Sequence, residues 1–321
     1  MNFETSNPSK RDKEIEKYIN YLGYYPNLFE QERQVEIERH IYNFIDEIYV
    51  KTDSVYLEDN FYGDAIKKEN NKFRIRYVSG EGRDADKFAA LHELGHVLLT
   101  PSKDNNCRYQ NAMPSQGPCK YDTYLHEFYG LGIDEGTINM LANISILKAD
   151  CPQFLEDYIK KGICCFKISS YRPLEEIARL LTIASLPCNE NSTSYFATII
   201  KNQKIADKES STYLNSCLNN DFSFEKEFNQ LFNDNYACYN LYKDIDKIHE
   251  QIIKKTEIDK KLLKNIFIKI NSYYTRKVHQ EIISGKLDVD KQEILQTNFN
   301  NYIEKAFNNL NIERGKKTNE V

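Results

Sequence analysis

The sequence predicts an α+β protein that is mostly helical. From about residue 134 onward, apolar side chains recur at spacings of three and four, which is the period of an amphipathic helix. Before that point, the segment KFRIRYVSG alternates apolar and polar residues, which is the period of a half-buried strand. The length of 321 residues suffices to bury a real core in one large domain or two ordinary ones.

The N-terminal part contains the expected short β-sheet. Residues 1–28 form a polar N-terminal segment, and a helix is expected after it, with one apolar stripe made by Ile37, Ile41, Phe44, Ile45 and Ile48. The segments SVYLEDNFYG and KFRIRYVSG follow, and the intervening KKENN is typical of a turn, so a hairpin or two neighbouring strands are expected. The loop SGEGRDAD is acidic, which suits the N-terminus of a helix that carries FAALHELGHVLLT.

Helices are expected to make up the rest of the chain. The stretch PSKDNNCRYQNAMPSQGPCK has no periodicity and is expected to be a long loop. Helical patterns then cover YDTYLHEFY and DEGTINMLANISILKA, and later PLEEIARLLTIA, EKEFNQLFNDNYACYNLYKDI, about 259 to 283 and about 289 to 310. The sequence therefore predicts a domain over residues 29–204 that contains the sheet, followed by a helical C-terminal region over residues 205–321.

Composition excludes several classes of partner. The net charge of −5, with 43 basic against 48 acidic residues, creates no field that would recruit nucleic acid or an anionic membrane. Neither the apolar run of a signal peptide nor a membrane-spanning stretch is visible, so we expect a cytoplasmic protein or one that is delivered into another cell. The eight cysteines form no CxxC pair, and we expect mostly reduced thiols.

The stretch HELGH indicates a metal site. Residues four apart lie on one face of a helix, so His92 and His96 can bind one cation through their imidazole nitrogens. Glu93 lies beside them, where its carboxylate can take a proton from a water that zinc has acidified. The alternative is a pair of ordinary histidines that form hydrogen bonds at a helix surface.

A catalytic zinc ion usually has three protein ligands and one open position, and the strongest candidate for the third ligand is Glu135. It lies at the start of a predicted helix shortly after the motif helix, and Asn139 follows one turn later, where it could orient His92 or His96. Alternatively, Asp134 and Glu135 only complement the N-terminus of that helix, and both roles can hold together.

Donors that stabilise a tetrahedral oxyanion are less clearly marked. Tyr129 and His126 are the nearest candidates, because both can donate a hydrogen bond to developing charge, although surface or core roles suit both as well. His249 and His279 lie in helical, charged surroundings and are expected to be plain surface histidines, although a C-terminal region can supply such a donor in folds of this kind.

With these residues the chain resembles the zincin metallopeptidases, and among them the thermolysin-like gluzincins, in which a strand and an HExxH helix precede a helix that supplies a glutamate. By this resemblance His92 and His96 match the two histidine ligands, Glu93 the general base and Glu135 the glutamate ligand. The string DEGTIN is similar to NEGxTE in bacterial zincin-like proteins, except that Asn139 stands where those carry an acidic residue. The resemblance implies a zincin-like domain over residues 29–204.

A second resemblance is to the ImmA/IrrE type of intracellular metallopeptidase, which KFAALHELGHVLL resembles, although the EAN-type sequence expected soon after it is absent. The zincin resemblance also implies that substrate adds as a strand along an edge strand above the motif helix, and it assigns KFRIRYVSG to that edge. Arg74 and Arg76 would then face substrate or form a solvated face.

Together these features predict a zinc-dependent metallopeptidase that acts on a protein or peptide substrate. Two alternatives remain: an ImmA/IrrE-like regulatory protein that acts on one specific protein partner, and a zinc-stabilised binding protein without turnover.

Overall fold

The computed structural model describes residues 8–22, 39, 41–51, 63–68, 72–79, 83–99, 119–122, 127–162, 171–194 and 223–311. The strands are β1 (Ile45–Lys51), β2 (Gly63–Lys67), β3 (Phe73–Val78), β4 (Lys120–Asp122) and β5 (Glu127–Tyr129). The α-helices are α1 (Pro8–Leu22), α3 (Arg83–Leu99), α4 (Leu131–Asp150), α5 (Leu155–Lys161), α6 (Arg172–Ser185), α9 (Ser223–Phe232), α10 (Ala237–Ile253), α11 (Lys260–Ile283) and α12 (Gln292–Asn309). Two short 3-10 helices are η4 (Pro152–Phe154) and η5 (Val289–Lys291). The described chain is thus mostly helical with a small mixed sheet, as the sequence predicts.

The three-stranded sheet has the order β1-β3-β2, with β3 parallel to β1 and antiparallel to β2. The predicted strand in KFRIRYVSG is confirmed as β3, whose alternating side chains Phe73, Ile75 and Tyr77 are buried. It is the central strand, however, so its assignment to the edge is wrong. The edge strand on the side of the motif helix is β2, which packs against α3 together with β3.

The helix expected across Ile45 and Ile48 is also wrong, because these residues belong to strand β1. Spacings of three and four among isoleucines fit a helix, yet branched side chains fit a pleated surface equally well. Pairing with β3 favours the strand, because it buries Ile45 and Ile48 and gives hydrogen-bond partners to the backbone groups that β1 and β3 turn toward each other. Of the expected helix, residues 41–44 are helical, and most of the residues before them lie outside the described ranges.

A second correction concerns YDTYLHEFY, for which the sequence predicts a helix. Its described residues lie in β4 and β5, which pair in antiparallel fashion through Lys120 with Tyr129 and Asp122 with Glu127. Aromatic residues are as common in strands as in helices, and this segment is too short for a helix without tertiary support. Tyr239 on α10 also donates a hydrogen bond of 2.6 Å to Glu127, which ties the hairpin to the C-terminal helices.

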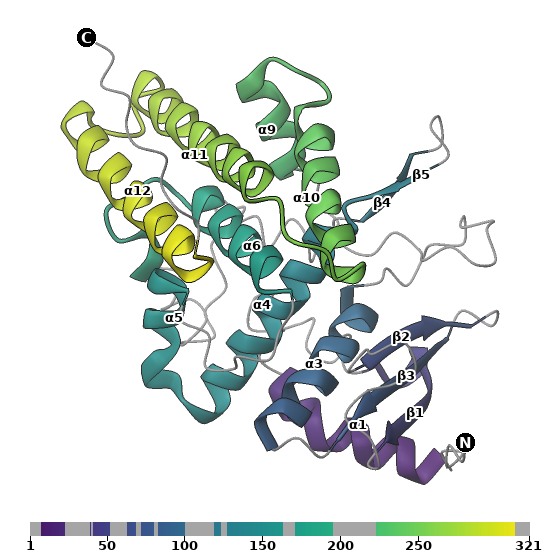
Figure 1. The fold of residues 1–321 in the computed structure, drawn as a ribbon. Helices are drawn as coiled ribbons and strands as arrows, with labels where there is room; N and C mark the ends of the chain where they lie inside the picture. The colour runs from purple at the N-terminus through teal and green to yellow at the C-terminus, as the bar shows by residue number, and fades with distance from the viewer. Residues whose placement is uncertain are drawn as a thin grey trace.

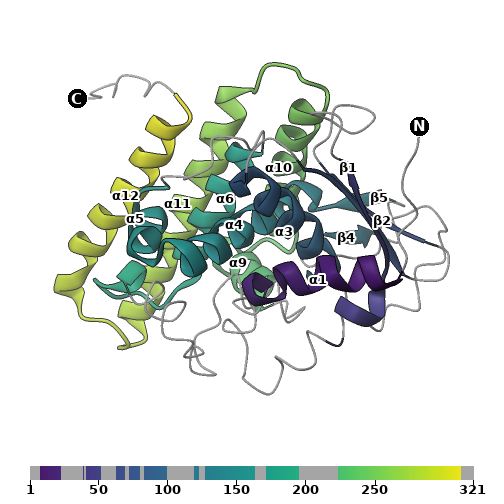
Figure 2. The ribbon, with the colours of Figure 1, turned by 90° about the horizontal axis from the view of Figure 1, so that it is seen from below.

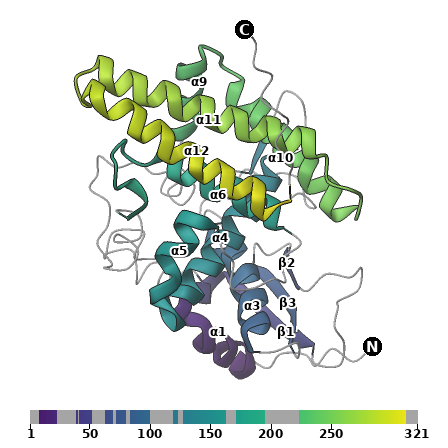
Figure 3. The same ribbon diagram turned by 60° about the vertical axis from the view of Figure 1, so that its left-hand side comes forward.

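The helices form a stack between the sheet and the C-terminus. In Figure 1 the sheet and α1 lie at one end, α11 and α12 at the other, and α4 and α6 between them. The view in Figure 3 shows the same order. α1 packs against β1, α3 and α4, and Figure 2 shows it on the side of the molecule that holds the sheet and α3. Among the described residues, no helix is long and apolar enough to cross a membrane.

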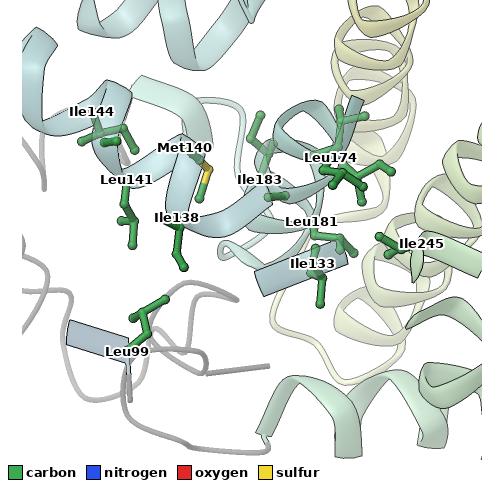
Figure 4. Packing of buried hydrophobic residues seen from close by; sticks show 14 of the residues in the cluster. Leu99, Ile133, Ile138, Met140, Leu141, Ile144, Leu174, Leu181, Ile183 and Ile245 are labelled. Carbon is green, nitrogen blue, oxygen red and sulfur yellow. The ribbon is translucent and has the colours of Figure 1, made fainter. Parts of the chain in front are cut away.

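The central contact of the core is between α4 and α6, and Figure 4 shows side chains from both helices meeting there. Gly136 makes this approach possible. A Cβ atom at Gly136 would lie 2.3 Å from the carbonyl oxygen of Leu174, which is backbone and cannot yield. α4 is buried on nearly all sides, and of its fourth and fifth residues Asp134 is buried and the side chain of Glu135 is 14% exposed.

The predicted C-terminal helices are confirmed with one change. The segment EKEFNQLFNDNYACYNLYKDI is divided between α9 and α10, with a break around Asn233, whose φ is 52°. α11 begins where the carboxylate of Asp259 accepts hydrogen bonds from two backbone N–H groups of the first turn. Buried apolar residues of these helices belong to the same core cluster as those of α3, α4 and α6. None of the described cysteines, Cys119, Cys151, Cys188 and Cys238, forms a disulfide.

Candidate metal centre

Helix α3 presents His92, Glu93 and His96 to the interior. It forms there because Ala89, Ala90, Leu91, Leu94 and Val97 give it a buried apolar surface against the sheet and α4. His92, Glu93 and His96 are themselves only 7, 5 and 6% exposed. Ordinary surface histidines are not so deeply buried, so the alternative of two histidines at a helix surface does not fit.

Glu135 meets the two histidines from helix α4. Its Oε2 atom lies 3.1 Å from Nε2 of His92, and its Oε1 atom lies 3.6 Å from Nε2 of His96. One ligand atom from each of the three residues lies within 4.8 Å of the other two. His92, His96 and Glu135, predicted as ligands from the sequence, thus form a buried group that could hold a metal ion.

The charges of this cluster are strongly coupled. Burial disfavours charge on both His96 and Glu135, but their attraction outweighs it. The attraction between the two charges raises the pKa of His96 to about 10, and the carboxylate of Asp134 adds to this rise. The same attraction lowers the pKa of Glu135 to about 2, and His92 adds to this decrease. Without a cation, the carboxylate of Glu135 is thus neutralised by a proton on His96. A metal ion that binds here would displace that proton and supply the positive charge beside the carboxylate of Glu135.

A second carboxylate lies behind the cluster. Oδ2 of Asp134 is 3.6 Å from Nδ1 of His96, and the side chain of Asp134 is 2% exposed. Burial raises the pKa of Asp134 to about 6, although the charge of His96 opposes this. The sequence suggested Asn139 for such an outer contact. Asn139 is fully buried on α4, but the acidic neighbour of His96 is Asp134, which the sequence analysis considered only for the helix N-terminus.

Glu93 lies beside the cluster and faces strand β2. Burial raises the pKa of Glu93 to about 7, against the attraction of His92 and His96, and the negative charges of Glu135 and Asp64 add to the rise. Asp64 on β2 forms an ion pair with Arg76 on β3. The general-base candidate is therefore a buried carboxyl group that exchanges its proton near neutral pH.

Two further residues lie next to the cluster: Tyr171, which was not predicted from the sequence, and His249, which was expected at the surface with a donor role left open. The ring of Tyr171, which directly precedes α6, stacks on the ring of His92 with a centroid distance of 6.0 Å and an interplanar angle of 12°. On its other side Tyr171 lies 5.6 Å from the ring of His249. Burial and the charges of Glu135 and Glu93 raise the pKa of Tyr171, so its hydroxyl remains a donor.

His249 is a correction to the sequence analysis, which expected a surface histidine. It is 7% exposed, and its buried Nε2 atom has no hydrogen-bond partner among the described residues. Its positive form lowers the pKa of Glu135. A sequence signal was available, because His249 follows the buried Ile245 by four residues on the apolar face of α10. His279, by contrast, is exposed as expected.

Of the two predicted oxyanion donors, Tyr129 and His126, the structure describes only Tyr129. Tyr129 lies in β5, and its ring contacts those of Tyr239 and Tyr242 on α10, at centroid distances of 4.9 and 6.4 Å. Its proposed part in catalysis stays a prediction. His126 lies outside the described residues.

The donor set itself fits a metal ion, since two imidazoles and a carboxylate converge from two helices. Comparison of the chain with protein-family models, curated proteins and solved structures found no match.

Proposed function

We propose that this protein is a zinc-dependent metallopeptidase. The observation that carries the proposal is the convergence of His92, His96 and Glu135 from two helices, with the carboxylate of Glu93 beside them and outside the ligand group. Three ligands and a separate base are the parts that metal-assisted hydrolysis requires.

Zinc is the metal that this donor set favours. Two histidine nitrogens and one carboxylate oxygen are a common set for catalytic zinc, which keeps its fourth position open for water and substrate. A site for calcium or magnesium would consist of oxygen atoms, and no cysteine takes part in the ligand group found among the described residues. When bound, zinc supplies acidity to a water molecule and polarises the carbonyl of the scissile peptide bond.

Glu93 is the proposed general base. Its carboxylate lies on the same helix as His92 and His96 but outside the ligand group, where it could accept a proton from the attacking water and later give it to the leaving amine. The rings of His92 and His96 are buried, and the side chain of Glu135 is only 14% exposed, so the packing around the ligand group restrains all three side chains during this exchange.

Tyr171 and His249 are the proposed donors to the oxyanion. Tyr171 keeps its proton because burial raises its pKa, and His249 has a buried Nε2 atom without a hydrogen-bond partner among the described residues. Both rings lie in contact, and Tyr171 reaches the cluster by stacking on His92. Donors that are fixed before the reaction stabilise developing charge without reorganisation.

The substrate is proposed to be an extended segment of a protein or peptide. Strand β2 is an edge strand that packs against α3, and an extended peptide can add to such an edge through backbone hydrogen bonds. The burial of the cluster favours a narrow range of substrates, as expected for a regulatory protein that cuts one partner. The same burial favours a second candidate function, in which zinc ties α3 to α4 without turnover.

The test combines zinc analysis with hydrolysis. Wild type and Glu135→Ala are compared for zinc per chain, and wild type and Glu93→Gln for cleavage of a peptide library read by mass spectrometry. We expect zinc to be lost in Glu135→Ala, and cleavage to be lost in Glu93→Gln with its zinc retained. Glu16→Gln, an exposed position on α1, is the matched control and should behave as wild type.

Absence of zinc from the wild type, even after zinc is added back, contradicts the proposal. Zinc that stabilises the fold, with no cleavage of any library member, supports the second candidate instead.

A further inference from the structure

Gly63, the first residue of strand β2, lies directly against the side chain of Glu93. A Cβ atom at Gly63 would be 2.5 Å from Oε1, 2.7 Å from Cγ and 2.8 Å from Cδ of Glu93. All three distances are shorter than real carbon contacts allow. The space that any other residue would need at position 63 is thus occupied by the carboxylate of Glu93.

The backbone of Gly63 does not itself require glycine. Among the described glycines, those in the left-handed region are Gly130, Gly162 and Gly285, and Gly63 is not one of them. Glycine inside a strand often marks a close approach by another group, and here that group is Glu93.

Neither partner of this contact can easily move away. β2 is held to β3 by pairing from Gly63 with Tyr77 to Lys67 with Phe73, and the ion pair between Asp64 and Arg76 adds to that hold. Glu93 is 5% exposed and lies in the middle of α3, so solvent offers no room for its side chain.

We infer that Gly63 is a positioning residue for Glu93: the missing side chain leaves room for the carboxylate, and the strand backbone keeps it beside the metal-ligand group. This inference rests on the proposed role of Glu93 as the general base. It assigns a function to the start of β2 that the ligand cluster alone does not suggest.

A substitution at Gly63 can separate this role from a structural one. All three atoms nearest to an added Cβ belong to the side chain of Glu93 and none to backbone, so the fold can accommodate alanine by displacing the carboxylate of Glu93, at a cost in stability because this side chain is buried. The expected effect is therefore a measurable loss of stability without unfolding, and a large loss of catalysis. A displacement of about 1 Å at a catalytic group can lower the rate by about 100-fold.

The experiment is a double-mutant cycle of Gly63→Ala and Glu93→Ala on the full chain. It is measured first as unfolding in urea of the zinc-free protein, which needs no activity. Glu93→Ala removes the three atoms that would lie nearest to the new Cβ. We therefore expect Gly63→Ala to destabilise the wild type measurably and to destabilise the Glu93→Ala background much less or not at all.

The second readout is catalysis by the zinc-loaded protein. We expect Gly63→Ala to keep wild-type zinc content and KM but to lower kcat by about 100-fold. Val50→Ala on strand β1 is the control, because it weakens the same sheet away from Glu93 and should leave kcat unchanged.

Equal effects of Gly63→Ala on stability in both backgrounds, or wild-type kcat in Gly63→Ala, would overturn the inference. A wild type that binds zinc but cleaves nothing would overturn the proposed function, and the zinc-free cycle would still decide whether Gly63 fixes Glu93.

Discussion

Asp246 on α10 accepts a hydrogen bond of 2.9 Å from the backbone N–H of Gly132, in the first turn of α4. Its other oxygen accepts one of 2.8 Å from the backbone N–H of Gly130. Gly130, the N-cap residue of α4, has no side chain to cap the helix, so the cap comes from a residue more than a hundred positions later. The helix that carries Glu135 is thus joined at its start to the helix that carries His249.

Loss of this cap should disturb the site through His249. We expect Asp246→Ala to lower the free energy of unfolding by about 2–4 kcal/mol, because two buried N–H groups lose a charged acceptor. In the zinc-loaded protein kcat should also fall, and the fall should be absent when His249 is already alanine. Urea unfolding and steady-state kinetics measure the two effects.

Asp244→Ala, which removes ion pairs to Lys247 and Lys269, is the control on the same helix and should change little. Additive losses of kcat in the double variant would show that Asp246 does not act through His249.

Substitution of His249 itself tests the proposed oxyanion donor. We expect His249→Gln to keep its zinc and to lower kcat by about 100-fold to 1000-fold, as removal of one oxyanion donor does in other hydrolases. Zinc per chain and kcat on a cleaved library peptide are the measurements. His279→Gln on the exposed side of α11 is the matched control. A variant with unchanged kcat would leave Tyr171 as the donor to be tested.

Asp134 is expected to govern zinc affinity without being a ligand. Its carboxylate lies 3.6 Å from Nδ1 of His96 and so favours an orientation of that ring that leaves Nε2 for the metal ion. We expect Asp134→Asn to weaken zinc binding by about 10-fold to 100-fold, measured by competition with a chelator of known affinity. Asp150→Asn at the end of the same helix serves as the control. Unchanged affinity in Asp134→Asn would mean that His96 is oriented by its packing alone.

A pH-dependent contribution to stability is expected from Glu175, which is remote from the ligand group. Burial raises the pKa of Glu175 from its ordinary value of 4.5 to about 7, although hydrogen bonds from Tyr158 and Asn143 to its Oε1 atom oppose the rise. Between these two pH values the folded chain keeps a proton that the unfolded chain has lost. Stability therefore falls as pH rises through this window, by about 3 kcal/mol in all.

Glu175→Gln removes this titration. The variant should be more stable than the wild type at pH 9, and the difference should shrink toward pH 4.5. Urea unfolding of the zinc-free protein at a series of pH values measures it, with Glu190→Gln at an exposed position as the control. A constant difference between variant and wild type across this range would contradict the assignment to Glu175.

Local pattern alone predicted the parts of this protein that depend on neighbours in the chain. His92, Glu93 and His96 share one helix, so their spacing is sufficient to place them together. α4, α6, α11 and α12 were predicted because an apolar stripe at helical period identifies a long helix regardless of what covers it. Glu135 was found because it begins the next such helix.

Only the tertiary structure decided the features that depend on partners distant in sequence. Ile45 and Ile48 became a strand because β3 was available to pair with them, and β3 became the central strand because β1 added to its other side. Tyr171, His249 and Asp134 joined the site through packing between helices, which leaves little mark on local periodicity. A single sequence shows which face of a helix or strand is apolar, but it does not show which other element packs against that face. The packing of α10 against α4, which brings His249 to the site, was therefore not predicted.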